Sequence, residues 1–375
     1  MAIHLCPQPA ARHAITRRLT RLIAVALAVA LGLGLATGLQ GLQAPLQAAP
    51  AARDTRLPAE AIVVDMRLAN IYGFSTNDKS YTVEGKLWLT YSAQIEQKLR
   101  QNNIDPIQLV SFYNKIKPWD SELIHLNQTP EQLSDGRRRS SYTFNGNFYA
   151  DDVDFRLSPF GGLDLPVIIQ AEPTPLSTAD SHQPLQLVAG EGELGSRVNI
   201  NGYELSGWQF KPIQRTRNSR LEQIRSLPPS RLEFLVSYQT SFWAALVEWI
   251  LPLIIVMSLT LFAPNICSAM GSERLAIPPV VLLTIVLMQQ SYRDSLPSLP
   301  YLTFLDGLYA YSYLVTLAIF VLFIRSSNLL NKAPHDQHTA VGRQIDRMGT
   351  IVQIGALSGY ALLVLSWFTA ARLPG

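Results

Sequence analysis

Residues 272–290 read SERLAIPPVVLLTIVLMQQ, and this stretch decides how the carboxyl-terminal third of the chain is interpreted. Its centre is apolar and close to the ~20 residues that a helix needs to cross a bilayer. However, the stretch begins with a charged pair, Glu273-Arg274, contains the adjacent prolines Pro278 and Pro279, and ends in two glutamines. Charges at membrane depth are costly and usually face water. The stretch therefore predicts a membrane helix with one face in contact with water.

A helical wheel defines that face. When residues are counted at ~100° each from Leu283, the polar and aliphatic residues nearest to it in angle form one stripe with a carboxylate at each end. One helix cannot enclose a pore, so the stripe predicts several copies around an axis. A four-helix anchor explains the pattern equally well, since an acidic residue is favoured near a helix start. The stripe consists of Glu273, Ala276, Val280, Leu283, Leu287, Gln290 and Asp294.

The two prolines leave the position of Glu273 open. Proline lacks a backbone N–H, so the carbonyls of Arg274 and Leu275 lose their helical partners. Either water satisfies these carbonyls within a continuous helix, or the regular helix begins near Pro278, where proline is tolerated. In the second case Glu273 does not follow the helical stripe.

Residues 242–375 are predicted to form a four-helix transmembrane domain. We expect the helices at about 242–262, 273–294, 301–324 and 348–370, each near the length that a bilayer requires. The link between the third and fourth helices has more basic than acidic residues, which places it in the cytoplasm by the positive-inside rule. The charged residues of this link are Arg325, Lys332, Arg343 and Arg347 against Asp336 and Asp346.

Residues 1–52 have the layout of a signal peptide and linker. Four arginines between residues 12 and 21 precede an apolar run from Leu22 to about Leu39, and small residues follow. This order predicts cleavage near Ala48 to Ala52. Because the apolar run is long, an uncleaved anchor is the alternative. In both cases residues 53–241 are exported.

The exported residues 53–241 are predicted to form a β-sandwich. In residues 80–92, SYTVEGKLWLTYS, apolar and polar side chains alternate, which is typical of a half-buried strand. Many short runs of this kind, separated by turns, favour an antiparallel sandwich, and residues 93–103 a short helix. The predicted fold is an extracellular antiparallel β-sandwich followed by a four-helix transmembrane bundle. Further strands are expected at 62–68, 141–149, 153–157, 165–169, 185–188, 203–210 and 232–238.

Several function classes are excluded by absent patterns. The formal net charge of +3 is too small to indicate nucleic-acid binding, and no phosphate-binding loop or zinc-type Cys/His spacing occurs. His335 and His338 lack acids or cysteines in register and are expected to face solvent rather than a metal. No nucleophile–base–acid arrangement is visible. We therefore expect no enzyme activity, no cofactor and no metal site.

The order of motifs points to a known family. Glu273-Arg274 starts the second apolar run, residues 296–301 (LPSLPY) follow it, and Asp306 lies early in the third. In the exported part, residues 81–89 (YTVEGKLWL) and 152–160 (DVDFRLSPF) add two more motifs. With these motifs, residues 60–370 resemble the pentameric ligand-gated ion channels, the Cys-loop receptor superfamily, in its prokaryotic branch.

The resemblance implies a homopentamer in the bacterial inner membrane, with the amino-terminal domain in the periplasm and the pore lined by the second helix. It implies a ring of Glu273 carboxylates that favours monovalent cations and a hydrophobic constriction at Leu283. Val280 and Leu287 would form neighbouring rings, and Asp294 an outer one. Gating by a small-molecule ligand or by protons is expected, with the ligand unidentified.

The resemblance also implies a ligand site between subunits, often built from aromatic residues. Trp88, Tyr91 and Trp119 are the candidates, although Trp88 and Trp119 fit a packing role equally well. No aromatic occurs in 171–202 or 211–232, so a full cage for an amine is not expected. The second gap is rich in arginine, and a solvated basic loop is favoured over a site for an anion.

Residues that couple the two domains are implied in two segments. Pro159 and Phe160 belong to the family's signature loop, and Pro297, Leu299 and Pro300 to the link between the second and third helices. Two charges of the family pattern are missing. Gly161 stands where a carboxylate is expected, and Tyr238-Gln239-Thr240 replaces the arginine expected before the first helix.

The leading hypothesis is therefore a ligand- or pH-gated, cation-selective channel. The rival is a non-conducting periplasmic binding or sensory module on a four-helix anchor. Five subunits around an axis favour the channel, whereas a monomer or a dimer favours the rival.

Overall fold

The computed structural model describes residues 61–127, 129–151, 153–172, 185–213, 230–266, 271–334 and 337–372. These residues divide into two compact units. A strand unit comprises the described parts of 61–154 and 162–240, and a helical unit comprises 155–161 and the described residues from 241 onward. The predicted signal segment 1–52, most of the arginine-rich stretch and His335 lie outside the described residues.

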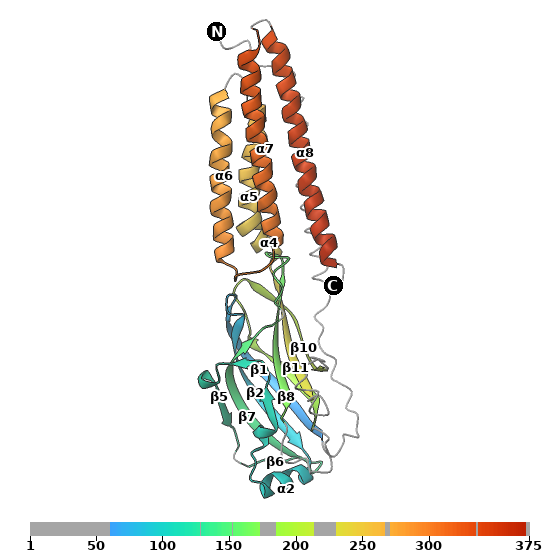
Figure 1. Ribbon diagram of the computed structural model, residues 1–375. Helices are drawn as coiled ribbons and strands as arrows, with labels where there is room; N and C mark the ends of the chain where they lie inside the picture. The colour runs from blue at the N-terminus through green and yellow to red at the C-terminus, as the bar shows by residue number, and fades with distance from the viewer. Residues whose placement is uncertain are drawn as a thin grey trace, which may run out of the picture. The chain divides into compact units, whose positions relative to one another are not determined.

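The strand unit contains two sheets (Figure 1). The larger sheet has the order β4-β7-β2-β1-β9, with β5 and β6 also pairing with β7. Its strands are β1 (Ala61–Ser75), β2 (Ser80–Tyr91), β4 (Lys115–Ile116), β5 (Glu122–His125), β6 (Glu131–Gln132), β7 (Arg138–Tyr149) and β9 (Gln186–Arg197). The smaller sheet has the order β10-β11-β8-β3 and consists of β3 (Val110–Phe112), β8 (Gly162–Ala171), β10 (Tyr203–Ile213) and β11 (Arg231–Thr240).

The predicted β-sandwich is confirmed, with two local differences. β1 and β9 pair in parallel, and the chain passes through the other sheet as β8 before it returns to this one as β9. The strand predicted at 153–157 is absent: Val153–Phe155 have no regular structure and a turn begins at Arg156. The predicted short helix is α2 (Ala93–Gln101), capped by Ser92.

Alternating residues of β2 build the core between the sheets. Tyr81, Val83, Leu87, Leu89 and Tyr91 are almost fully buried. The Tyr81 hydroxyl donates to the carbonyl of Pro166 in the other sheet. Removing apolar side chains from water supplies most of the stability of such a core.

A bulge in β9 brings a carboxylate close to the backbone. Val64 pairs with Ala189 and Met66 with Gly192, so Gly190 and Glu191 both lie opposite Asp65. The Asp65 carboxylate accepts from the Glu191 N–H at 2.6 Å and from Arg139 Nη2 at 2.7 Å. A Cβ at Gly190 would lie 2.0 Å from Asp65 Oδ1, so only glycine leaves room for this contact.

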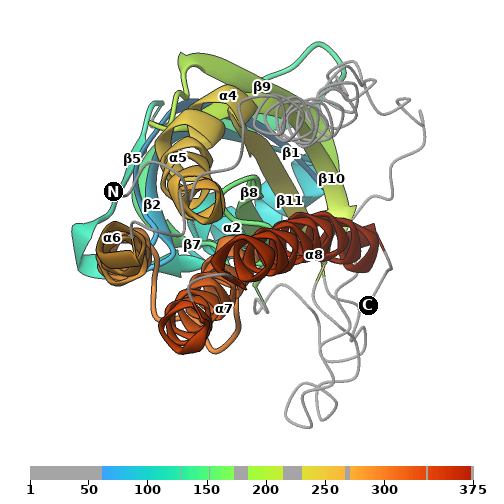
Figure 2. The same ribbon diagram turned by 90° about the horizontal axis from the view of Figure 1, so that it is seen from above.

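The helical unit contains four long helical segments (Figures 1 and 2). The first combines α4 (Phe242–Ala245), a π-helical turn (Leu246–Ile250) and α5 (Leu251–Phe262). The others are α6 (Gly271–Asp294), α7 (Phe304–Lys332) and α8 (His338–Arg372). The stretches Phe242–Asn265, Gly271–Asp294, Phe304–Lys332 and Ala340–Trp367 are each long and apolar enough to cross a membrane.

The third and fourth helices are longer than the sequence predicts. α7 continues through Lys332 instead of ending near Ile324, and α8 begins at His338 instead of near Met348. A prediction based on apolar runs stops at the first charged residues, but the helices continue past them. The predicted 325–347 link is therefore largely helical, and His338 begins α8.

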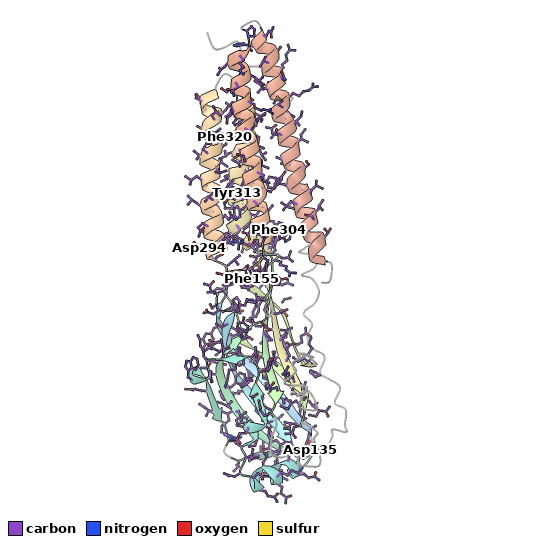
Figure 3. The ribbon with its side chains drawn as sticks, viewed as in Figure 1. Asp135, Phe155, Asp294, Phe304, Tyr313 and Phe320 are labelled. Atoms are coloured by element: carbon purple, nitrogen blue, oxygen red, sulfur yellow. The ribbon has the colours of Figure 1, made fainter. Side chains whose placement is uncertain are left out.

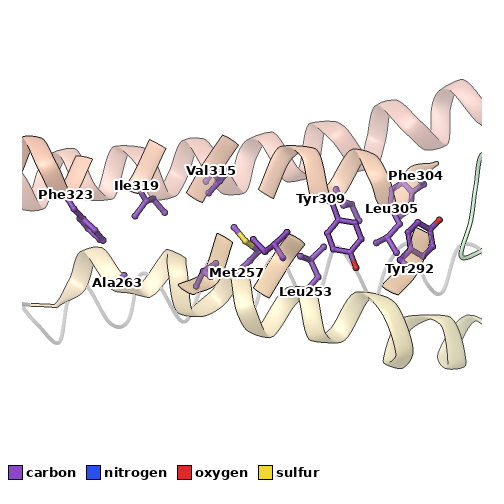
Figure 4. Close-up of a cluster of buried hydrophobic side chains, with 14 residues drawn as sticks. Leu253, Met257, Ala263, Tyr292, Phe304, Leu305, Tyr309, Val315, Ile319 and Phe323 are labelled. Atoms are coloured by element: carbon purple, nitrogen blue, oxygen red, sulfur yellow. The ribbon is translucent and has the colours of Figure 1, made fainter. Parts of the chain in front are cut away.

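Buried side chains from these helices form one core, shown in Figure 4. Ile319 and Leu305 of α7 and Ile285 of α6 are fully buried, and Met257 of α5 is 4% exposed. Aliphatic residues of α7 and α8 such as Leu314, Leu317, Ile351 and Leu362 remain exposed, as expected for faces that contact lipid.

The Gly190 contact yields a prediction for stability. Gly190→Ala should lower the free energy of unfolding by about 1–3 kcal/mol, since the added methyl overlaps the bound Asp65 carboxylate. Thermal unfolding of the full-length protein in detergent measures the effect. Gly146→Ala is the matched control, because its Cβ would meet the movable Lys115 side chain at 3.3 Å and the Phe148 ring at 3.6 Å, which is an ordinary van der Waals distance. Equal losses for both variants would contradict the assignment.

Candidate functional site

Helix α6 is continuous through both prolines. It includes Glu273, Pro278 and Pro279 within Gly271–Asp294. The possibility that the regular helix begins near Pro278 is therefore wrong, and Glu273 follows the helical stripe. The carbonyls of Arg274 and Leu275 still lack helical donors, because proline has no N–H to supply.

α6 has two distinct faces. Its buried residues recur at spacings of three, four or seven residues, which keeps them on one side of the helix. They are Arg274, Pro278, Val281, Ile285 and Tyr292. The seven residues of the predicted stripe, from Glu273 to Asp294, are all exposed. Packing within one chain therefore fixes the rotation of α6 and leaves the whole stripe free.

The exposed stripe has an apolar centre and an acidic residue at each end. Val280, Leu283 and Leu287 in its centre are 65%, 61% and 63% exposed. The carboxylates of Glu273 and Asp294 lie at opposite ends of α6. Gln290 Nε2 donates to Asp294 Oδ1 at 2.9 Å, and Ser272 Oγ donates to Glu273 Oε2 at 2.9 Å. The carboxylates at its two ends are unfavourable in hydrocarbon and favourable beside water.

A polar network joins α6 to α7 near Asp294. Arg293 Nε donates to Asp306 Oδ1 at 2.8 Å, and the Asp306 residue is only 1% exposed. Asp306 Oδ2 accepts from the backbone N–H and the hydroxyl of Thr303, at 2.9 and 2.8 Å. Thr303 caps α7, so one carboxylate closes the helix start and holds α6. Figure 3 marks Asp294 and Phe304 at this end of the helical unit.

Three contacts, made by Gln289, Tyr313 and Tyr292, extend the network along α6 and α7. The Tyr313 hydroxyl donates to Gln289 Oε1 at 2.6 Å, and Gln289 Nε2 lies 3.5 Å from Asp306 Oδ1. Tyr292 donates to Thr303 Oγ1 at 2.8 Å. Buried polar groups require such partners, because an unpaired one loses the hydrogen bonds that water would give it.

The loop Phe155–Gly161 packs among the helices as part of the helical unit. The Arg156 carbonyl accepts from the Phe304 N–H at 2.8 Å and from Trp367 Nε1 at 3.2 Å. The Phe155 N–H donates to the Tyr301 hydroxyl at 3.1 Å. Contacts with both α7 and α8 therefore fix the loop backbone.

The predicted coupling residues lie in this region with differing exposure. The Phe160 ring stacks on Phe242 at 5.2 Å and lies 6.1 Å from Phe304. Pro159, which follows a cis peptide bond, and Pro297 are buried. Leu299 is half-buried, and Pro300 is exposed.

Sequence reasoning missed several residues that the structure brings together here. The sequence patterns predict no role for Arg293, Tyr292 and Thr303, although these residues contact Asp306 or its helix cap. One signal was available: Thr303 followed by Asp306 three residues later resembles a capping box at the start of an apolar run. No local sequence pattern indicates that Arg293 pairs with Asp306, because the two residues are 13 positions apart.

The three candidate ligand residues occupy different environments in the strand unit. Tyr91 is buried; burial raises the pKa of its hydroxyl, and a hydrogen bond with Ser140 opposes that shift. Trp119 is 82% exposed. Trp88 lines an open depression of about 380 Å³ together with Asp65, Met66, Arg139, Glu191, Gly192 and Glu193. Within one chain, Trp119 does not line this depression.

Across the described ranges, no group of three or more His, Cys, Asp or Glu side chains could hold a metal ion. A comparison with known protein families gave no match, and a comparison with curated proteins gave none either. The fold therefore defines the class: a β-sandwich followed by four apolar helices, which indicates a multi-pass membrane protein. This arrangement is compatible with the fold of a pentameric channel.

The contact between Arg293 and Asp306 yields a second prediction. Arg293→Gln should lower the free energy of unfolding by about 1–3 kcal/mol, since it leaves a buried carboxylate short of one donor. Asp306→Asn should cost less in the Arg293→Gln background than on its own, because the pair is then already broken and only the cap of α7 is still affected. Thermal unfolding of the single and double variants gives this double-mutant cycle, with exposed Arg325→Gln as the control. Additive losses would show that the two side chains do not interact.

Proposed function

We propose that the chain is the subunit of a homopentameric, cation-selective ion channel that a small-molecule ligand or protons open. The two faces of α6 are the observation that carries the proposal. One face, which includes Arg274 and Ile285, is buried, while all seven residues of the stripe from Glu273 to Asp294 are exposed in a helix of membrane length. Arranged around a five-fold axis, the stripe meets water and the aliphatic faces of α7 and α8 meet lipid.

Each part of the stripe then has a physical task. Five copies of Leu283, flanked by Val280 and Leu287, form an apolar constriction that stops conduction by dewetting. The Glu273 ring at one end attracts cations and repels anions. Asp294 and Gln290 at the other end concentrate cations before they enter.

The loop Phe155–Gly161 supplies a path for gating. It follows β7 and precedes β8 in the chain, and its backbone is fixed to α7 and α8. A ligand that moves β7 or β8 therefore pulls on Phe304 and Phe160. The coupling needs no distant charge interaction, because the chain itself carries the force.

The proposal includes the membrane orientation and the ligand-binding face. The amino-terminal domain lies in the periplasm, and the carboxyl-terminal part of α7 and the start of α8 face the cytoplasm of a bacterial inner membrane. Trp88 and Trp119, which are apart in one chain, belong to facing surfaces of neighbouring subunits. The ligand binds between them.

The rival function, a non-conducting sensory module, shares the fold but not the assembly. Chemical cross-linking and size-exclusion chromatography separate the two. A monomer or a dimer in detergent and in lipid favours the rival, and five subunits favour the channel.

Conductance tests the channel directly. Reconstituted protein should give single-channel currents that reverse near the cation equilibrium potential in a salt gradient. Glu273→Ala should lower the cation-to-anion permeability ratio by at least about fivefold, because one charge at 4 Å contributes about 1 kcal/mol even in water. No current at any tested pH or with any tested metabolite would count against the function. An unchanged reversal potential in the variant would remove Glu273 from the pore.

The constriction gives a separate prediction. Leu283→Ala should lower the ligand concentration or the pH change needed for half-maximal opening by several-fold, since a smaller side chain widens and wets the constriction. Dose–response recordings measure this shift. The matched control is Leu317→Ala, because Leu317 is 54% exposed on α7 and faces lipid in the proposed pentamer. A larger shift in Leu317→Ala than in Leu283→Ala would place the constriction elsewhere.

A further inference from the structure

Arg274 is a buried cation at the start of α6, and the proposed function assigns it no role in the pore. The residue is 3% exposed. Its Nη2 donates to the carbonyl of Pro264 at 2.7 Å, and its guanidinium lies 4.9 Å from the centre of the Phe323 ring. Asp346 of α8 interacts with it electrostatically. Among the described residues, its Nε has no hydrogen-bond partner.

This location is unfavourable for a positive charge that serves only solubility. The start of a helix carries a partial positive charge, which repels a cation. Burial removes the guanidinium from water, and one donor remains unsatisfied. The exposed side of the same helical turn offers hydration, yet the side chain points into the bundle. The contacts with Pro264 and Phe323 must therefore compensate for the lost hydration.

The adjacent prolines explain why the first turn of α6 needs those contacts. Pro278 and Pro279 remove two consecutive backbone hydrogen bonds, those to the carbonyls of Arg274 and Leu275. The first turn of α6 is therefore attached to the rest of the helix less firmly than an ordinary turn. Glu273 lies in this turn, is exposed, and has one side-chain partner among the described residues, the neighbouring Ser272.

Helix geometry links the two residues. Glu273 and Arg274 are adjacent, so their side chains leave the helix about 100° apart. A fixed Arg274 direction therefore fixes the Glu273 direction. Two elements supply the contacts, the turn that contains Pro264 and α7 through Phe323, and the negative charge of Asp346 on α8 favours the guanidinium electrostatically.

We infer that Arg274 is a positioning residue: its buried guanidinium fixes the first turn of α6 and thereby holds the Glu273 carboxylate towards the ion path. This inference rests on the proposed channel. It assigns the cation preference to a pair of adjacent residues, of which one meets ions and the other never does.

The sign of one measured effect separates positioning from simple electrostatics. A positive charge beside the path repels cations, so its removal raises cation preference if charge alone matters. Removal of an anchor lowers cation preference, because the Glu273 carboxylate is then no longer held in place. Arg274→Gln therefore gives opposite results under the two explanations.

Reversal potentials in a salt gradient provide the test. Arg274→Lys keeps the charge but loses the planar donor group, and Phe323→Leu removes the ring without touching Arg274. Arg274→Gln, Arg274→Lys and Phe323→Leu should each lower the cation-to-anion permeability ratio several-fold towards the value of Glu273→Ala. Arg325→Lys, at an exposed arginine of α7, is the matched control and should leave the ratio unchanged.

A chemical readout tests the anchor without any current. In a background with Cys6 and Cys267 replaced by serine, Glu273→Cys reacts with a cationic thiosulfonate reagent at a measurable rate. Adding Arg274→Lys or Phe323→Leu should change that rate several-fold, and adding Arg325→Lys should not. If Arg274 variants fail to assemble, Phe323→Leu still gives both measurements.

The outcomes separate this inference from the proposed function. A higher permeability ratio in Arg274→Gln, or unchanged ratios in Arg274→Lys and Phe323→Leu, overturns the inference while the channel stands. A protein that never conducts overturns the channel. In that case the modification rates decide whether Arg274 positions residue 273, and equal rates in all backgrounds reject it.

Discussion

A membrane helix that carries carboxylates on one stripe cannot leave that stripe in hydrocarbon, and the helical unit is arranged around this constraint. α6 satisfies its other face within the chain, where Val281, Ile285 and Tyr292 are buried. The exposed stripe then needs a partner that one chain does not provide. In the proposed channel, water held between several copies meets the exposed carboxylates of Glu273 and Asp294.

The two ends of α6 are fixed by different chemistry. At the Asp294 end, Asp306 accepts hydrogen bonds from Arg293 and from the start of α7, so one buried carboxylate determines the positions of two helices. At the Glu273 end, a buried cation contacts a carbonyl and an aromatic ring. The body of the helix between them is held by apolar packing. Rotation of α6 therefore requires changes at polar contacts at both ends.

Sequence patterns predicted the fold because each pattern reflects a local rule. Alternation in residues 80–92 predicts β2, and apolar length predicts the spans. The exposed stripe was also readable, since helical spacing places Glu273, Leu283 and Asp294 on one side. Contacts between segments that are distant in the chain could not be predicted from the sequence. The sequence around Arg293 does not predict its contact with Asp306, and the sequence around Phe155 does not predict its contact with Tyr301. Such pairs depend on how separate elements pack.

The contacts of the loop Phe155–Gly161 show how its position is fixed without the carboxylate that the resembled family pattern has there. Gly161 stands where the family pattern has a carboxylate, so the loop cannot rely on an ion pair there. Instead, backbone groups of Phe155 and Arg156 bond to Tyr301, Phe304 and Trp367, and the Phe160 ring stacks on Phe242. Exposed ion pairs weaken with salt and gain little energy, whereas these contacts are local and partly buried. In the proposed channel, a loop held in this way would transmit displacement through packing, so coupling there would not need the carboxylate that the family pattern has at this position.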